Sequence, residues 1–128
     1  MSELHFLVPG DLDTPTGGYQ YDRRIIQGLR ARGVSLALHR LDDSFPFPGE
    51  DALAAAARVL AGIPDAATVV IDGLAYAPLL AYLQPRHRLV ALIHHPLASE
   101  TGLPDGLREG FRQRERAALA LATRVIVT

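Results

Sequence analysis

The chain has 128 residues, a formal net charge of −1 and no cysteine. This length fits one domain, the balanced charge argues against a nucleic-acid binder, and the lack of cysteine excludes disulfides and thiolate metal sites. The first residues, MSELHFLVPGD, lack the basic segment and long apolar run of a signal peptide. No apolar run approaches the ~18 residues of a membrane span. We therefore expect a cytoplasmic protein whose sequence does not indicate membrane contact.

Short apolar runs alternate with helical patterns along the whole chain. The runs rich in Val, Ile and Leu predict strands at Leu4–Val8, Val34–His39, Thr68–Ile71, Arg88–His94 and Arg124–Thr128. Apolar stripes at helical spacing predict helices around residues 21–29, 53–60, 78–83 and 107–121. The last three strands are nearly continuous in hydrophobicity, which is typical of strands covered on both faces.

This strict alternation predicts an α/β fold, a doubly wound parallel sheet of about five strands with helices on both faces. In such sheets ligands bind beyond the carboxyl ends of the strands, where the strand order reverses. An order of 3-2-1-4-5 would place this switch point between the first and fourth strands. Three polar features would then converge on one crevice: the turn ending in TGGY, Asp72-Gly73 and IHHPLASETG.

Gly17 and Gly18 stand where the first strand hands over to the first helix. A helix N-terminus carries a partial positive charge and unpaired N–H groups, and glycine lets a phosphate or sugar approach the backbone closely. The same pair could serve only to make the turn. The spacings of a dinucleotide fingerprint and of a P-loop are both absent.

His94 and His95 stand at the end of the fourth strand, at the predicted crevice. Adjacent residues at a strand end point to opposite sides, so one can face a ligand while the other packs or meets solvent. Either could donate to a sugar hydroxyl or contact a phosphate, whereas diverging side chains make a metal pair unfavourable. Asp72 could bind a hydroxyl or act as a turn residue before Gly73. Glu100 could line the site or be a solvated loop charge.

Four segments together resemble the bacterial family 4 glycosyltransferases: FLVPGDLDTPTGGYQYDRRIIQGLRARG, VIDGLAYAPL, LVALIHHPLASETGL and RERAALALATRVIVT. They cover essentially the whole chain in order, and the first segment and IHHPL are the most specific. Members have the GT-B fold, in which two Rossmann-like domains face each other across a cleft. The resemblance implies that residues 1–128 form the N-terminal, acceptor-side domain. The C-terminal domain, which mostly holds the nucleotide-sugar donor, has no counterpart in these residues.

The resemblance also implies roles for matching positions. His94 corresponds to the active-site histidine, and the backbone of Gly17 and Gly18 should approach the donor diphosphate. On the acceptor side the implied residues are Tyr19, Asp72, His95 and Glu100. The family transfers a sugar from a nucleotide-sugar donor to an acceptor hydroxyl with retention and without a bound metal, so we expect no cofactor. Donor sugar, nucleotide and acceptor stay open.

A non-catalytic module is the alternative: a free-standing Rossmann-like domain that binds a small ligand or a protein. Because the chain stops inside the predicted strand TRVIVT, we expect the native protein to continue past Thr128. A second Rossmann-like half with two spaced glutamates would favour the glycosyltransferase. The 128 residues alone are expected to bind nucleotide sugar weakly and not to turn it over.

Overall fold

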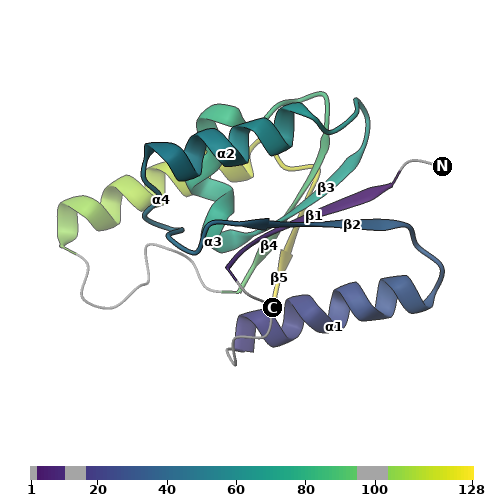
Figure 1. The fold of residues 1–128 in the computed structure, drawn as a ribbon. Coiled ribbons are helices and arrows are strands. Elements are labelled where there is room, and N and C mark those ends of the chain that lie inside the picture. The colour runs from purple at the N-terminus through teal and green to yellow at the C-terminus, as the bar shows by residue number, and fades with distance from the viewer. Residues whose placement is uncertain (1–2, 11–16, 95–103) are drawn as a thin grey trace.

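The structure, a computed structural model, describes residues 3–10, 17–94 and 104–128. It contains a five-stranded sheet with helices on both faces, which confirms the predicted fold class (Figure 1). The strands are β1 (Leu4–Pro9), β2 (Leu36–Leu41), β3 (Thr68–Asp72), β4 (Arg88–Ile93) and β5 (Arg124–Val127). The helices are α1 (Gly17–Ala31), α2 (Glu50–Ala61), α3 (Gly73–Tyr76), the 3₁₀-helix η1 (Ala77–Tyr82) and α4 (Asp105–Leu119). None of these described helices is long and apolar enough to cross a membrane.

The strands run parallel in the order β2-β1-β3-β4-β5. The predicted order was wrong, because β3 rather than β4 pairs with β1. Burial agrees with the observed order: four of the five residues of β3 are buried, as in a central strand, whereas β2 lies at an edge and carries half-buried His39 and exposed Arg40. The strand order therefore reverses between β1 and β3, and the ligand crevice is expected beyond these two strands.

The two faces of the sheet are covered unequally. Among the described helices, α1 alone lies on one face, and α2, α3, η1 and α4 lie on the other (Figure 1). The core under α1 is small and consists of Phe6, Val8, Ile26, Leu36, Val70 and Leu92. The opposite core is larger and includes Tyr76, whose hydroxyl donates to the Ala118 carbonyl at 2.7 Å. Because burial of each aliphatic side chain contributes roughly 1.5–3 kcal/mol, the larger core supplies most of the hydrophobic stabilisation.

β5 is an edge strand, and the expectation that it is covered on both faces was wrong. It pairs with β4 on one side, and the side chains of Val125, Ile126 and Val127 are 44%, 43% and 72% exposed. A continuous apolar run therefore indicates a strand here without indicating how many of its faces are covered.

Two of the element boundaries that differ from their predictions have clear local causes. β2 begins at Leu36 rather than Val34, because the Val34 amide closes the C-terminal turn of α1 by donating to the Leu29 carbonyl at 3.0 Å. α3 begins at Gly73, several residues before the predicted third helix, because the Asp72 carboxylate caps it by accepting from the Leu74 amide at 2.9 Å. Asp72 therefore ends a strand and starts a helix.

Gly73 allows the β3–α3 junction to lie against β4, which brings Asp72 close to the end of that strand. A Cβ on Gly73 would lie 3.0 Å from Ile93 Cδ1 and 3.2 Å from the Leu92 carbonyl oxygen. We expect Gly73→Ala to lower the free energy of unfolding by about 1–3 kcal/mol in urea denaturation. Gly28→Ala is the matched control, because a Cβ there meets nothing within 4 Å inside α1. It should raise stability by up to ~1 kcal/mol, and equal effects of the two changes would contradict the steric explanation.

Candidate functional site

The two-residue alternation of β3 and β4 brings Asp72 and His94 to the same face of the sheet. Val70 and Leu92 point into the core under α1, so residues two positions later point the same way. Asp72 pairs in register with Leu92, and His94 follows β4 directly. Because parallel strands end at the same edge, the carboxyl and the imidazole meet there. The predicted convergence of these two residues is confirmed.

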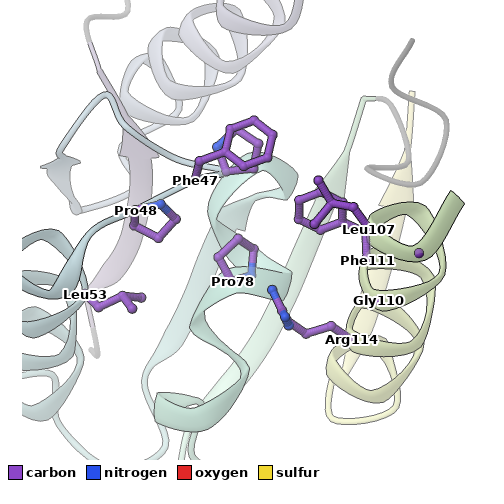
Figure 2. Close-up of a pocket in the computed structure, with 10 residues that line it drawn as sticks. Phe47, Pro48, Leu53, Pro78, Leu107, Gly110, Phe111 and Arg114 are labelled. Carbon is purple, nitrogen blue, oxygen red and sulfur yellow. The ribbon is translucent and has the colours of Figure 1, made fainter. Parts of the chain in front are cut away.

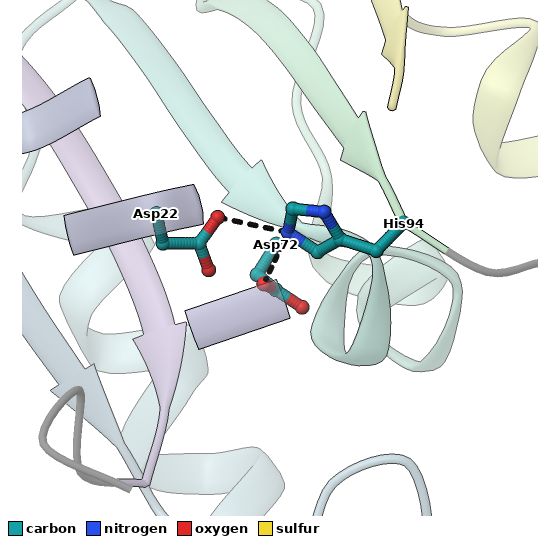
Figure 3. A group of neighbouring side chains, drawn as sticks. All are labelled: Asp22, Asp72 and His94. Atoms are coloured by element: carbon teal, nitrogen blue, oxygen red, sulfur yellow. Dashed lines mark hydrogen bonds and ion pairs between the residues drawn. The ribbon is translucent and has the colours of Figure 1, made fainter. Parts of the chain in front are cut away.

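α1 supplies a third member of this cluster, Asp22, whose side chain is fully buried. Asp22 precedes Ile26 by one helical turn, and Ile26 is packed in the core between α1 and the sheet. The carboxyl group therefore points toward the sheet rather than to solvent. We refer to Asp22, Asp72 and His94 as the histidine–carboxyl cluster (Figure 3).

The imidazole of His94 makes contacts through both of its nitrogens. Nε2 lies 2.9 Å from Asp22 Oδ1 and 3.3 Å from Asp72 Oδ2 (Figure 3). Nδ1 lies 3.0 Å from Thr128 Oγ1 on the exposed side. The ring of Tyr21 contacts the imidazole edge-on, with ring centroids 5.5 Å apart. Because carboxyl groups enclose Nε2, the exposed nitrogen Nδ1 is the one that a ligand can reach.

The surroundings shift the pKa of each member of the cluster. Hydrogen bonds to Asp22 and Asp72 raise the pKa of His94 to about 9, so the ring is a cation at neutral pH. Burial is the main cause that raises the pKa of Asp22 to about 8. Burial opposes ionisation of Asp72 as well, but hydrogen bonds from His94, Asp22 and the Leu74 amide outweigh it and lower the pKa of Asp72. The cluster is therefore close to neutral overall at pH 7.

The other predicted site residues divide into two groups. Gly17 and Gly18 are the first two residues of α1, which confirms their predicted place at a helix N-terminus. Gly18 precedes Asp22 by four residues, so the backbone at the mouth of α1 lies one turn above the cluster. His95 and Glu100 lie outside the described residues.

Tyr19 lies beside the end of β1, where a Cβ on Gly10 would come 3.3 Å from its hydroxyl. Burial, together with the negative charges of Asp72, Asp22 and Asp43, raises the pKa of Tyr19. Tyr19 is therefore close enough to sense the carboxyl groups of the cluster, as expected for a residue at the same edge of the sheet.

Two carboxyl groups and one imidazole are also groups that can bind a divalent cation, and their possible ligand atoms lie within 4.8 Å of one another. The arrangement nevertheless has the form of a hydrogen-bonded cluster. The same nitrogen, Nε2, faces both carboxyl groups at hydrogen-bond or ion-pair distance, and in the cationic ring it carries a hydrogen. A cation could bind there only by replacing that proton.

A second feature of the carboxyl edge is an apolar groove on the opposite face of the sheet, with a volume of about 270 Å³. The connection between β2 and α2 borders it through Phe47, and the first turns of α4 border it through Leu107 and Phe111 (Figure 2). The loop DDSFPFPGED, residues 42–51, contains Phe47. Its Phe47 ring stacks edge-on against Phe111, with centroids 5.6 Å apart, so the loop packs against α4.

Asp22 was not predicted as a site residue, although the chain contains a signal for it. Asp22, Ile26 and Leu29 stand at i, i+4 and i+7 of α1, which is the spacing of one buried helical face. The apolar stripe predicted around residues 21–29 starts instead at Tyr21, which is 36% exposed. A carboxyl group on the apolar face of a helix is unusual because burial of its charge is unfavourable without a partner.

The fold and the site together define a class of protein: an open, doubly wound α/β domain with a histidine–carboxyl cluster beside its switch point. Comparison of the chain with protein-family models, with curated proteins and with solved structures finds no match. The geometry of the cluster and the resemblance of the four segments therefore carry the functional assignment.

Proposed function

We propose that the chain is the acceptor-side domain of a retaining glycosyltransferase, which moves a sugar from a nucleotide-sugar donor to an acceptor hydroxyl. The observation that carries the proposal is the position of His94: it follows β4, contacts Asp72 at the end of β3, and lies under the first turns of α1. The histidine and the glycine-led helix, which the resemblance assigns to one active site, are thus neighbours.

In this proposal the bond between the anomeric carbon and the donor diphosphate breaks, and the acceptor oxygen bonds to that carbon. The proton of the acceptor hydroxyl leaves with the diphosphate. The N–H groups of Gly17 and Gly18 approach the diphosphate, which becomes more negative as it departs. His94 is the catalytic residue: as a cation it donates from Nδ1 to an oxygen of the reacting groups. Tyr19 and Asp72 lie on the acceptor side.

Binding of the donor by these residues alone is expected to be weak. A helix N-terminus contributes about 0.3–1 kcal/mol to an anion contact, and ~2 kcal/mol at best. A dissociation constant of 1 mM already corresponds to about 4 kcal/mol. The donor is accordingly held mainly by a second domain, as in the family that the chain resembles.

The test is an NMR titration of the ¹⁵N-labelled chain with UDP- and GDP-sugars. We expect millimolar ligand to shift the amide signals of Gly17 and Gly18 and the ring signals of His94. Gly18→Val should abolish these shifts, because its side chain blocks the approach to the backbone. Gly106→Val is the matched control, since Gly106 stands in the first turn of α4, where a Cβ meets nothing within 4 Å.

Three outcomes would contradict the proposal. Unchanged shifts in Gly18→Val would remove the glycine pair from the site. Micromolar affinity by calorimetry would show that the chain holds the donor without a second domain. Shifts confined to a surface remote from His94 would favour a non-catalytic binding module.

A further inference from the structure

Asp22 has no role in the proposed transfer, yet it contributes a fully buried carboxyl group to the contacts of His94. We infer that Asp22 is a positioning residue: it shares a proton with Asp72, and the carboxyl pair holds the His94 ring as a cation with Nδ1–H turned toward the ligand. The inference about the ring stands without the proposed function. Only the identity of the ligand rests on the proposed function.

The oxygens of the two carboxyl groups indicate that a proton is shared between them. Asp22 Oδ2 and Asp72 Oδ2 are both buried and have no hydrogen-bond partner among the described residues, although Asp72 Oδ2 lies at ion-pair distance, 3.3 Å, from His94 Nε2. Two ionised carboxylates around one imidazolium would bury a net negative charge, which is strongly unfavourable. One proton shared between the two groups removes that charge and gives both oxygens a partner. Aspartic-protease dyads hold a proton between neighbouring carboxyl groups for the same electrostatic reason.

The contacts of the His94 ring indicate its orientation. In the cationic ring Nε2 donates its hydrogen to Asp22 Oδ1 and forms an ion pair with Asp72 Oδ2, so this nitrogen faces the carboxyl groups and cannot contact a ligand. The Tyr21 ring lies edge-on to the imidazole and limits its rotation. Nδ1 faces the exposed side, where its partner is the Thr128 hydroxyl at 3.0 Å. A ligand oxygen can take the place of that hydroxyl.

The charge of the ring determines what it can do there. A doubly protonated imidazole donates hydrogen bonds and cannot act as a general base. His94 therefore suits an oxygen that gains negative charge, and not the removal of a proton from the acceptor. Among the described residues, the titratable groups that face it are Asp22 and Tyr21 from α1 and Asp72 from the end of β3, and the Thr128 hydroxyl after β5 is its remaining polar contact. Burial raises the pKa of Tyr19 of α1, which is near enough to the two carboxyl groups for their charges to raise it further.

The test measures the two ring nitrogens of His94 directly by ¹⁵N NMR as a function of pH, with no nucleotide sugar present. In the metal-free wild-type chain, both nitrogens should be protonated at pH 7. Asp22→Asn keeps the shape but removes the shared proton and a negative partner, so the midpoint of the His94 titration should fall by about one pH unit or more. Thr128→Ala removes the partner of Nδ1, and Glu109→Gln removes a carboxylate from an exposed pair on α4. Both should leave the midpoint where it is.

Several results would overturn the inference. One is a neutral His94 at pH 7 in the wild-type chain, which needs no variant and so holds even where Asp22→Asn does not fold. Another is a His94 titration midpoint that is the same in the wild type and in folded Asp22→Asn. A third is a neutral ring whose signals shift when zinc is added, since this would assign the cluster to a metal. Failure of donor binding would count against the proposed function and leave these measurements unaffected.

Discussion

Replacing His94 by alanine is expected to lower the free energy of unfolding by about 3 kcal/mol at pH 7, measured by urea denaturation. The imidazolium is the only described positive partner of the buried Asp22 and Asp72 carboxyl groups. Its removal leaves Asp72 ionised without compensation, or requires it to take up a proton. Loss of activity in His94→Ala would therefore combine lost chemistry with lost stability, and stability must be measured beside it.

A double-mutant cycle with Asp22→Asn distinguishes the energetic coupling between His94 and Asp22 from a simple loss of packing. In a His94→Ala background Asp22 no longer has its partner, so Asp22→Asn should cost much less than in the wild type. The difference is expected to be about 1–3 kcal/mol, as for residues in one buried network. Strict additivity of the two changes would contradict the coupling between α1 and the end of β4.

Stability should fall as the pH rises from 6.5 to 9.5. The pKa of His94 is raised from 6.5 to about 9, so the stability that it contributes is complete below pH 6.5 and is lost as the pH passes through 9. The pKa of Asp22 is raised from 3.8 to about 8, and it contributes with the same sign because the folded state favours its neutral form. Asp72 has the opposite sign, but its lowered pKa places its effect at acid pH.

The expected decrease in the free energy of unfolding across this window is about 2 kcal/mol or more, measured by urea denaturation at each pH. Asp22→Asn should make the profile shallower, since the amide does not ionise. Glu109→Gln should reproduce the wild-type slope, because Glu109 is half-exposed and pairs with Arg112 on the surface of α4. A flat or rising wild-type profile would refute the assignment of both pKa shifts.

The sequence predicts the layers of this fold well because its periodicities are strong. Alternating apolar runs and stripes report which segments are strands and helices, and the glycines at Gly17 and Gly33 mark the two ends of the first helix region. Strand order depends on pairings between distant segments, which local patterns do not encode. Only the exposed polar residues of β2 hint that it lies at an edge rather than beside the centre.

The candidate site was likewise predictable where it depends on local patterns, and it was not predictable where it depends on contacts between distant segments. Asp72 and His94 were predictable because the carboxyl ends of parallel strands meet at one edge. Asp22 was missed because helical spacing alone fixes a face only to within one residue, and Tyr21 fitted the apolar stripe better by residue type. Helical spacing also does not indicate that a cation lies beneath that face, because His94 is 72 residues further along the chain.

That separation has a consequence for how the domain is assembled. Among the described helices, α1 alone covers its face of the sheet, and its link to His94 closes a very long loop. The cluster can form only after β3, β4 and α1 have all docked. The protonated ring of His94 thus reports completion of the native assembly: local detachment of α1 would expose both carboxyl groups and release the ring to titrate like a free histidine, before the larger core on the far face unfolds.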